Sequence, residues 1–162
     1  INDAGMQLVT VYQDRNNALS DFTYAHGKAD GKAAIDFALK IGQPITTPIY
    51  FSIDYDANSS NISYVYKYFS GINDAMKEFK DKDSKGRYWQ IGGYGSYFAV
   101  KSLYENGYAT YIWQTKSWSG DKKYNYHLYQ DKHDYTLCGI KVDRNITNPD
   151  KNNCFGGFFI AN

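Results

Sequence analysis

The sequence predicts a single α/β domain with a largely parallel sheet, and three observations support this prediction. Segments typical of strands alternate with segments typical of amphipathic helices over the first two thirds of the chain, an order usual for parallel sheets. A short apolar run, residues 49–53, has the composition of a buried strand and leads directly into two carboxylates. A chain of 162 residues is also long enough to bury a substantial core. We therefore expect one domain over residues 1–162.

The N-terminal third is expected to form a strand, a helix and a second strand. Residues 7–13 have the pattern of a strand, and the polar loop 14–17 follows. Apolar residues then recur on one helical face over 34–39, and the glycine and proline within 42–44 end that helix. The run 49–53 is rich in β-branched and aromatic residues, which predicts a buried strand.

The middle third continues the alternation. Segment 57–60 offers several helix N-caps. The helix after it is the best defined, because apolar residues recur at intervals of three and four from Ile62 to Phe79. Residues 89–95 predict a third strand, whose glycines suit close approach of the backbone to a neighbour or a ligand. A short helix over 99–103 then ends at Asn106 and Gly107.

In the last third, predicted strands follow one another without predicted helices between them. Three segments typical of strands, 109–114, 126–130 and 139–143, are separated by only about ten residues each. Because a parallel crossover normally needs about a dozen residues or more, two arrangements are open. Either the sheet becomes antiparallel here, or short irregular loops join the strands.

Asp54 and Asp56 are the first candidate functional residues. They follow the predicted strand 49–53 and are two positions apart, so on a strand they would point to the same face. Paired carboxylates at the carboxyl end of a parallel strand are typical of glycoside hydrolysis. Two alternatives are that they end the strand and cap the next helix, or that they hold Mg²⁺, Mn²⁺ or Ca²⁺.

Composition limits the classes of partner. The 18 basic and 17 acidic residues are interspersed, so no charge pattern indicates nucleic acid or an anionic membrane. No apolar run approaches the length of about 18 residues that a membrane span needs. The 17 tyrosines suit a sugar-binding cleft, because rings stack on sugars while hydroxyls bond to them, but tyrosine could equally replace leucine in the core.

Cysteine and histidine give weaker signals. Cys138 and Cys154 could form a disulfide or remain two free thiols, and their spacing predicts no metal site. His26, His127 and His133 lack the spacing of metal ligands, so we expect them to be structural or exposed. No cofactor is expected.

Several strings along the chain together resemble a known family, the bacterial glycoside hydrolase-like domains of unknown function of the Rv2525c-like type, which are related to the family 25 lysozymes. The resemblance covers nearly the whole chain and keeps the order of the strings. They are VYQ (11–13), IYFSIDYD (49–56), YFSGI (68–72), GYGSY (93–97), YIWQT (111–115), WSG (118–120), LYQ (128–130) and VDRN (142–145).

This resemblance implies an irregular TIM-type (β/α) barrel with five β/α units followed by three strands. It also implies that the first two strands of the family pattern precede Ile1, so the domain is expected to be incomplete at its N-terminus. The open barrel edge would then be covered by the missing segment or by another chain.

The resemblance also implies site residues. Asp54 matches the first carboxylate of the lysozyme pair, Asp56 stands where those enzymes carry a glutamate that serves as general acid, and Asp143 matches a carboxylate of the last strand. The shorter Asp56 side chain would retract the proton donor, and displacements near 1 Å can cost about 100-fold in rate. The substrate-binding residues expected at the strand ends are Tyr12, Gln13, Tyr94, Tyr97, Trp113, Gln114, Tyr129 and Gln130.

Two functions follow as hypotheses. The first is a lysozyme-like glycosidase that cleaves peptidoglycan or a related cell-wall glycan outside the cell or at its surface, with Asp56 as the acid and Asp54 as the stabilising carboxylate. The second is a carbohydrate-binding module on the same barrel that has lost efficient catalysis. Trp113, Gln114 and Gln130 could serve the sugar in either case, or could only pack the barrel and anchor loops.

Overall fold

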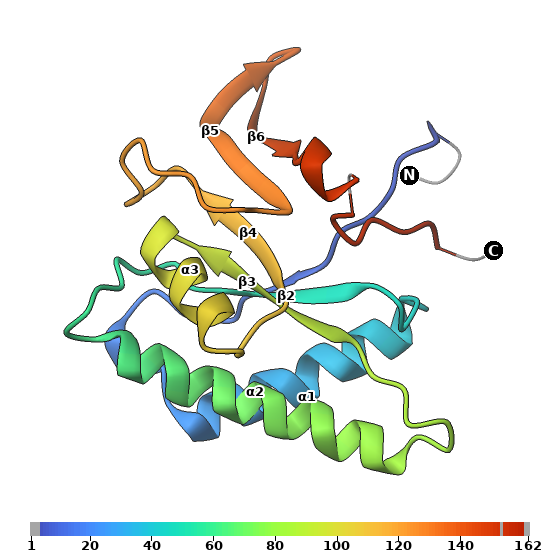
Figure 1. Cartoon of the computed structure of the whole chain (residues 1–162). Helices are drawn as coiled ribbons and strands as arrows, with labels where there is room; N and C mark the ends of the chain where they lie inside the picture. The colour runs from blue at the N-terminus through green and yellow to red at the C-terminus, as the bar shows by residue number, and fades with distance from the viewer. Residues whose placement is uncertain (1–3, 153, 161–162) are drawn as a thin grey trace.

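The computed structural model describes residues 4–152 and 154–160, and its centre is one six-stranded sheet in which the strands stand in chain order. The first five strands are parallel, and the last pairs antiparallel with the fifth. The sheet twists and curls into an open half-barrel (Figure 1). Its strands are β1 (Val11–Tyr12), β2 (Pro48–Ser52), β3 (Gln90–Gly95), β4 (Tyr111–Thr115), β5 (Leu128–Leu137) and β6 (Ile140–Thr147).

Three α-helices connect the first four strands, and they are α1 (Tyr24–Lys40), α2 (Ile62–Lys82) and α3 (Tyr97–Glu105). Two of them begin at a side-chain cap: the Thr23 hydroxyl accepts a hydrogen bond from the His26 amide, and the Ser96 hydroxyl accepts one from the Ala99 amide. None of the helices among the described residues is long and apolar enough to cross a lipid bilayer.

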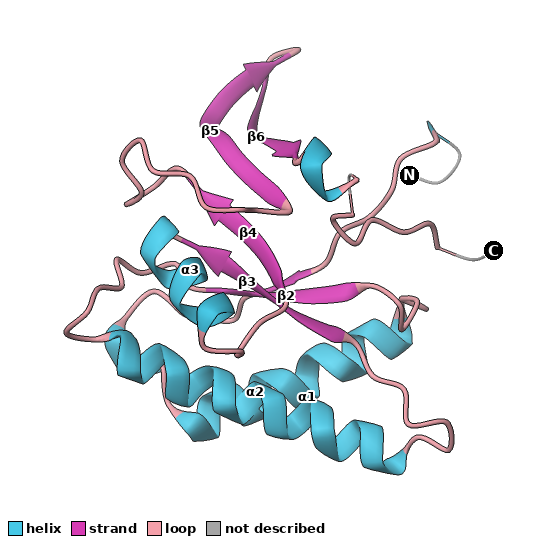
Figure 2. Cartoon of the chain, viewed as in Figure 1, coloured by secondary structure: helices cyan, strands magenta, loops and turns pink. Residues whose placement is uncertain are grey.

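The core lies between the helices and one face of the sheet. In Figure 2, α1 and α2 run side by side beneath the strands, while the β5–β6 hairpin projects away from them. Ile49 and Phe51 of β2 point into this core, where they meet Phe69 and Ile72 of α2. The opposite face of the sheet, called the inner face below, carries the alternate residues of each strand because strand side chains alternate with period two.

Glycines allow α1 and α2 to approach each other closely. A Cβ atom on Gly27 would lie 1.9 Å from the Tyr68 carbonyl oxygen, and one on Gly71 would lie 2.2 Å from that of Tyr24. In β3 the added Cβ of Gly92 would meet the Tyr50 ring at 2.4 Å. These glycines therefore accommodate neighbouring parts of the chain.

The last third of the chain combines both arrangements that its sequence left open. β4 and β5 are parallel although an irregular segment, residues 116–127, joins them, and β5 then turns back into antiparallel β6. The hairpin is longer than the sequence pattern indicated. Cys138 lies at its turn, and both Cys138 and Cys154 are free and exposed.

The two ends of the described chain meet beside the first strands. Leu8 and Phe158 exchange backbone hydrogen bonds of 2.8 and 3.0 Å. The Tyr50 hydroxyl donates to the Phe155 carbonyl oxygen at 3.0 Å. The C-terminal segment thus returns to the N-terminal edge of the sheet.

Candidate functional site

A polar pocket of about 300 Å³ opens on the inner face, at the carboxyl ends of the parallel strands. Gln13 follows β1, Asp54 follows β2, and Tyr94 and Thr115 stand at the ends of β3 and β4. This is the end of a parallel sheet where α/β proteins usually bind ligands. The residues that line the pocket are Gln13, Asp54, Tyr94, Thr115, Ser117, Trp118, Gln130, His133 and Asp143.

A chain of hydrogen bonds crosses the pocket from β3 to β6. The Tyr94 hydroxyl donates to Oε1 of Gln130 at 2.5 Å, and Nε2 of Gln130 donates to Oδ2 of Asp143 at 2.5 Å. The Asp134 amide donates to Oδ1 of Asp143 at 3.0 Å. Both oxygens of Asp143 therefore accept hydrogen bonds, as an ionised carboxylate does.

Asp54 is held less firmly than Asp143. Its side chain is exposed and accepts one long hydrogen bond, 3.4 Å, from Nε2 of Gln13. Its backbone is anchored, because the Asp54 amide donates to the Asn16 carbonyl oxygen at 2.9 Å. The loop after β1 thus positions the end of β2, while the Asp54 carboxylate remains open to the pocket.

Tyr94 is placed within electrostatic reach of both pocket carboxylates. Burial raises the pKa of the Tyr94 hydroxyl, and the charges of Asp54 and Asp143 raise it further. Hydrogen bonding of the Tyr94 hydroxyl with Thr115 and Gln130 lowers its pKa and so acts in the opposite direction. Tyr94 is therefore a neutral hydrogen-bonding group at ordinary pH.

The structure does not bring Asp56 to this pocket. Strand β2 ends at Ser52, so residues 53–56 lie outside the strand and its two-residue alternation need not hold as far as Asp56. Asp56 is exposed and is not among the lining residues. The expectation that Asp54 and Asp56 face one pocket is not met, and Asp143 is the second carboxylate there.

The strand-end residues divide between the two faces of the sheet. Gln130 pairs with Thr115 and faces the pocket, whereas Gln114 and Tyr129 pair with each other and point to the opposite side. Gln114 anchors a loop there: it donates to the Lys122 carbonyl oxygen and accepts from the Tyr124 amide, both at 2.8 Å. Tyr129 lines a different depression of the surface.

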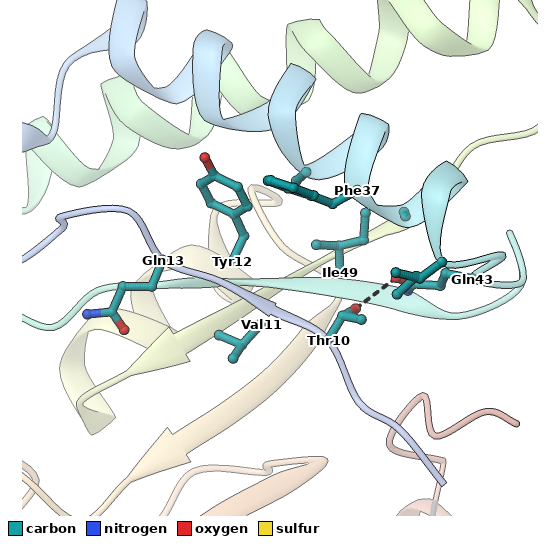
Figure 3. A pocket seen from close by; sticks show the side chains of 10 residues that line it. Thr10, Val11, Tyr12, Gln13, Phe37, Gln43 and Ile49 are labelled. Carbon is teal, nitrogen blue, oxygen red and sulfur yellow. Dashed lines mark hydrogen bonds between the residues drawn. The ribbon is translucent and has the colours of Figure 1, made fainter. Parts of the chain in front are cut away.

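Tyr12 and Tyr97 also lie away from the pocket. Figure 3 shows Tyr12 directed toward α1, where its ring centroid is 6.4 Å from that of Phe37, while Gln13 points to the other side. Tyr12 therefore lines a second cavity of about 280 Å³ between β1 and α1. Tyr97 begins α3 and packs edge-on against Tyr124.

Trp113 supports the inner face without lining the pocket. Its ring meets Tyr50 and Tyr94 edge-on, at 5.4 and 5.3 Å between centroids. Its indole Nε1 donates to Oδ1 of Asn145 at 2.8 Å, which ties β4 to β6. The exposed aromatic ring at the pocket is that of Trp118, 49% exposed, which has a positive φ of 54°.

Four lining residues are not among the expected site residues: Thr115, Ser117, Trp118 and His133. Oγ of Ser117 lies 2.9 Å from Nε2 of His133, whose Nδ1 is 4.0 Å from Asp143 Oδ2. Ser117 and His133 lie outside the strings that carry the family resemblance, while Thr115 and Trp118 lie in two of these strings but were given no role. The irregular loop after β4 and the hairpin bring these residues together. His133 is exposed, as expected, but it is also part of the pocket wall.

One group among the described residues has the composition of a metal site. Asp14, His26 and Asp30 offer ligand atoms that lie within 4.8 Å of one another. They come from the loop after β1 and the first turns of α1, and none of them lines the pocket.

Comparison with known proteins gives one family match and two curated relatives. A family model described as "Rv2525c-like, glycoside hydrolase-like domain" matches residues 1–147. The Bacillus subtilis (strain 168) proteins YbfG and FadG, both described as uncharacterized, are 32% identical over 96 residues and 34% identical over 77 residues. These matches cover 59% and 47% of this chain but only 13% of each relative, so the chain spans about an eighth of their length.

Two solved structures resemble the fold. Both are of the Mycobacterium tuberculosis Tat-secreted protein Rv2525c, one in complex with HEPES (TM-score 0.78, 19% identity) and one with L-tartrate (TM-score 0.69, 21% identity). Each match covers 96% of this chain and 73% of the other chain. At this level of identity the likeness concerns the fold.

Proposed function

Because this chain belongs to the Rv2525c-like family of glycoside hydrolase-like domains, we propose that its pocket binds a cell-wall glycan such as peptidoglycan and cleaves a glycosidic bond. The observation that carries the proposal is the meeting of Asp54 and Asp143 in one pocket at the carboxyl ends of the strands. Most glycosidases use two carboxylic acid residues that flank the glycosidic bond to be cleaved.

The hydrogen bonds suggest a division of roles. Asp143 accepts a hydrogen bond at each carboxylate oxygen and is suited to stabilise positive charge at the sugar. Asp54 accepts one long bond, and its open carboxyl group can give a proton to the leaving oxygen. Asp56 loses the acid role given to it above, because it lies outside the pocket.

The other pocket residues suit a sugar ligand. Trp118 offers an exposed ring on which an apolar sugar face can stack, and Gln13 offers an amide for hydroxyl groups. The structural relative Rv2525c is described as Tat-secreted and as a complex with L-tartrate, a small polyhydroxylated acid. An extracellular or cell-surface location would bring this domain to cell-wall glycans.

Reducing-end release from purified cell walls tests the catalytic proposal. Asp54→Asn and Asp143→Asn should each abolish release, while the matched variant Asp56→Asn should retain it because Asp56 is equally exposed but lies outside the pocket. Release that survives both pocket substitutions, or none by the parent protein from several wall types, contradicts the proposal.

A second candidate is a glycan-binding module without catalysis. It is favoured by the exposure of both pocket carboxylates, because a catalytic acid usually stands in a less hydrated place. Calorimetry with muropeptides and chitooligosaccharides should then show binding that Trp118→Ala weakens and Asp54→Asn leaves intact. Turnover that depends on Asp54 excludes this candidate.

The finer fold, an irregular TIM-type barrel whose open edge is covered by further strands, is also a proposal. It is supported by the curl of the sheet and by the exposed position of β1, which pairs only with β2 among the described strands. The cavity between β1 and α1 is lined largely by apolar side chains such as Ile49 and Phe37, the latter 57% exposed (Figure 3). A covering segment from the same protein or another chain would bury this surface.

A further inference from the structure

We propose that Asp14, His26 and Asp30 bind one divalent metal ion, and that Zn²⁺ suits the three ligands best. The group joins the loop after β1 to the first two turns of α1, and it is separate from the glycan pocket. His26 and Asp30 are four residues apart on α1, so they share one helical face. Asp14 approaches this face from the loop.

The distances among the three ligands approach those of a metal site. Nε2 of His26 lies 3.5 Å from Oδ1 of Asp30 and 3.9 Å from Oδ2 of Asp14. In a tetrahedral zinc site with bonds of about 2.1 Å, ligand atoms stand about 3.4 Å apart. His26 and Asp30 already have this spacing, and a movement of the exposed Asp14 side chain would shorten its separations from both, which are within 4.8 Å.

The hydrogen bonding of the His26 ring gives the strongest argument. Its Nδ1 lies 2.6 Å from the Asp21 carbonyl oxygen, which can only accept, so Nδ1 carries a hydrogen. In the neutral imidazole, Nε2 then presents a lone pair toward two carboxylate oxygens. This Nε2 atom is buried and has no hydrogen-bond partner among the described residues. A cation between the three groups resolves the repulsion.

A divalent ion would balance the charges of the two carboxylates in the group. Asp30 is only 4% exposed, so its charge needs a partner close by. Arg15 is 3.7 Å from Asp14 but is itself exposed, so it compensates the buried Asp30 weakly.

Asp30 and His26 each form a further hydrogen bond that orients the side chain, as metal ligands usually do. The Tyr68 hydroxyl donates to Oδ2 of Asp30 at 2.6 Å and accepts from Nδ2 of Asn16 at 3.0 Å, which leaves Oδ1 of Asp30 for the ion. The bond from Nδ1 of His26 to a backbone carbonyl fixes the ring orientation and tautomer. Every buried ligand thus has a second partner.

The choice of ion follows from the ligand types. One imidazole nitrogen with two carboxylates suits Zn²⁺, whereas Mg²⁺ and Ca²⁺ prefer ligands that are all oxygen. The exposure of Asp14 leaves room for water as the fourth ligand. The bound ion would fasten the loop that carries Gln13 and Asn16, both of which contact Asp54.

Zinc titration of the chelator-treated protein tests the proposal, in a Cys138→Ser/Cys154→Ser background that removes the two exposed thiols. Calorimetry should show one zinc ion per chain, and zinc should raise the melting temperature. Asp14→Asn and His26→Asn should each weaken binding about 100-fold or more. The asparagine at position 26 can still donate to the Asp21 carbonyl oxygen but has no Nε2.

Asp36→Asn is the matched control, because it removes the same charge from the exposed face of α1 outside the group. It should leave zinc affinity and the zinc-induced rise in melting temperature unchanged. His133→Asn, which removes an exposed imidazole at the glycan pocket, should also leave both unchanged. Zinc binding equal in the parent, Asp14→Asn and His26→Asn proteins, or no one-to-one binding by the parent, would overturn the proposal.

Discussion

Gln130 is the residue that links the two sides of the polar pocket at the strand ends, because its one amide group bonds to both Tyr94 and Asp143. It is only 4% exposed, so its loss would leave a phenol and a carboxylate without their partner. Gln130→Met should lower the free energy of unfolding by about 1–3 kcal/mol, measured by urea titration. Gln13→Met, which removes an exposed 3.4 Å bond, should change it little. Equal losses in the two variants would contradict this account.

His127 makes stability depend on pH. Burial, and to a smaller extent the Lys151 charge, lowers the pKa of His127 from 6.5 to about 4. Its Nδ1 accepts a hydrogen bond from the Ile112 amide at 3.0 Å, so the folded protein keeps this nitrogen unprotonated. Between these two values the unfolded chain binds more protons than the folded one. The stabilisation is therefore complete above about pH 6.5 and is lost as pH falls toward 4.

Urea titrations at several pH values measure this effect. Between pH 7 and pH 4 the His127 contribution should fall by on the order of 2 kcal/mol. His127→Asn can keep an acceptor for the Ile112 amide but cannot titrate, so its stability should depend less on pH over this interval. The same pH dependence in both proteins would show that other groups cause it.

At the scale of elements, the contact between α1 and α2 depends on glycine. Gly27→Ala should lower the free energy of unfolding by about 3 kcal/mol, because the new methyl group would overlap the Tyr68 carbonyl oxygen. This loss exceeds the gain of about 1 kcal/mol that alanine brings to a helix. Ser70→Ala, beside the other contact glycine on α2, is the control and should be nearly neutral. Thermal and urea unfolding can be compared, and a stabilised Gly27→Ala protein would refute the close contact.

The same contact explains which helix the sequence could predict. α2 was predicted almost to its ends because its apolar residues repeat at helical intervals. The first half of α1 was not predicted, because Gly27 and Gly31 replace the apolar side chains that would reveal the pattern. A side chain at either position would collide with α2, so both positions require glycine. This contact between the helices exists only in the folded molecule and leaves no pattern in the sequence.

The candidate site, too, could be predicted from the sequence only in part. Asp54, Asp143, Gln13, Tyr94 and Gln130 were predicted from strand-end position and family resemblance, and the structure brings them to one pocket. The two-residue alternation that connected Asp56 to Asp54 fails because β2 ends at Ser52. Tyr12, Gln114 and Tyr129 were expected beside these residues but point to the opposite face of the sheet, since which residues of a strand face inward depends on the register.

At the scale of the whole molecule, the edge of β1 that none of the described strands covers should favour association. Val11 is 45% exposed on an edge strand, and such edges pair readily with other chains. We expect the 162-residue chain to associate with itself at high concentration, measured by sedimentation equilibrium, and Val11→Lys to reduce the association. Tyr104→Lys, at a site of similar exposure on α3, should not reduce it. Association equally affected by both variants would exclude β1 as the contact.

The strands occupy the sheet in the order in which they occur in the chain, and this has a consequence for folding during synthesis. Each strand can pair with the one made just before it, so the sheet can grow as the ribosome releases the chain. The bridge between Leu8 and Phe158 and the bond from Tyr50 to Phe155 are different, since they join segments at opposite ends of the described chain. The attachment of residues 155–158 to Leu8 and Tyr50 is therefore the step that must wait until these last residues have been synthesised.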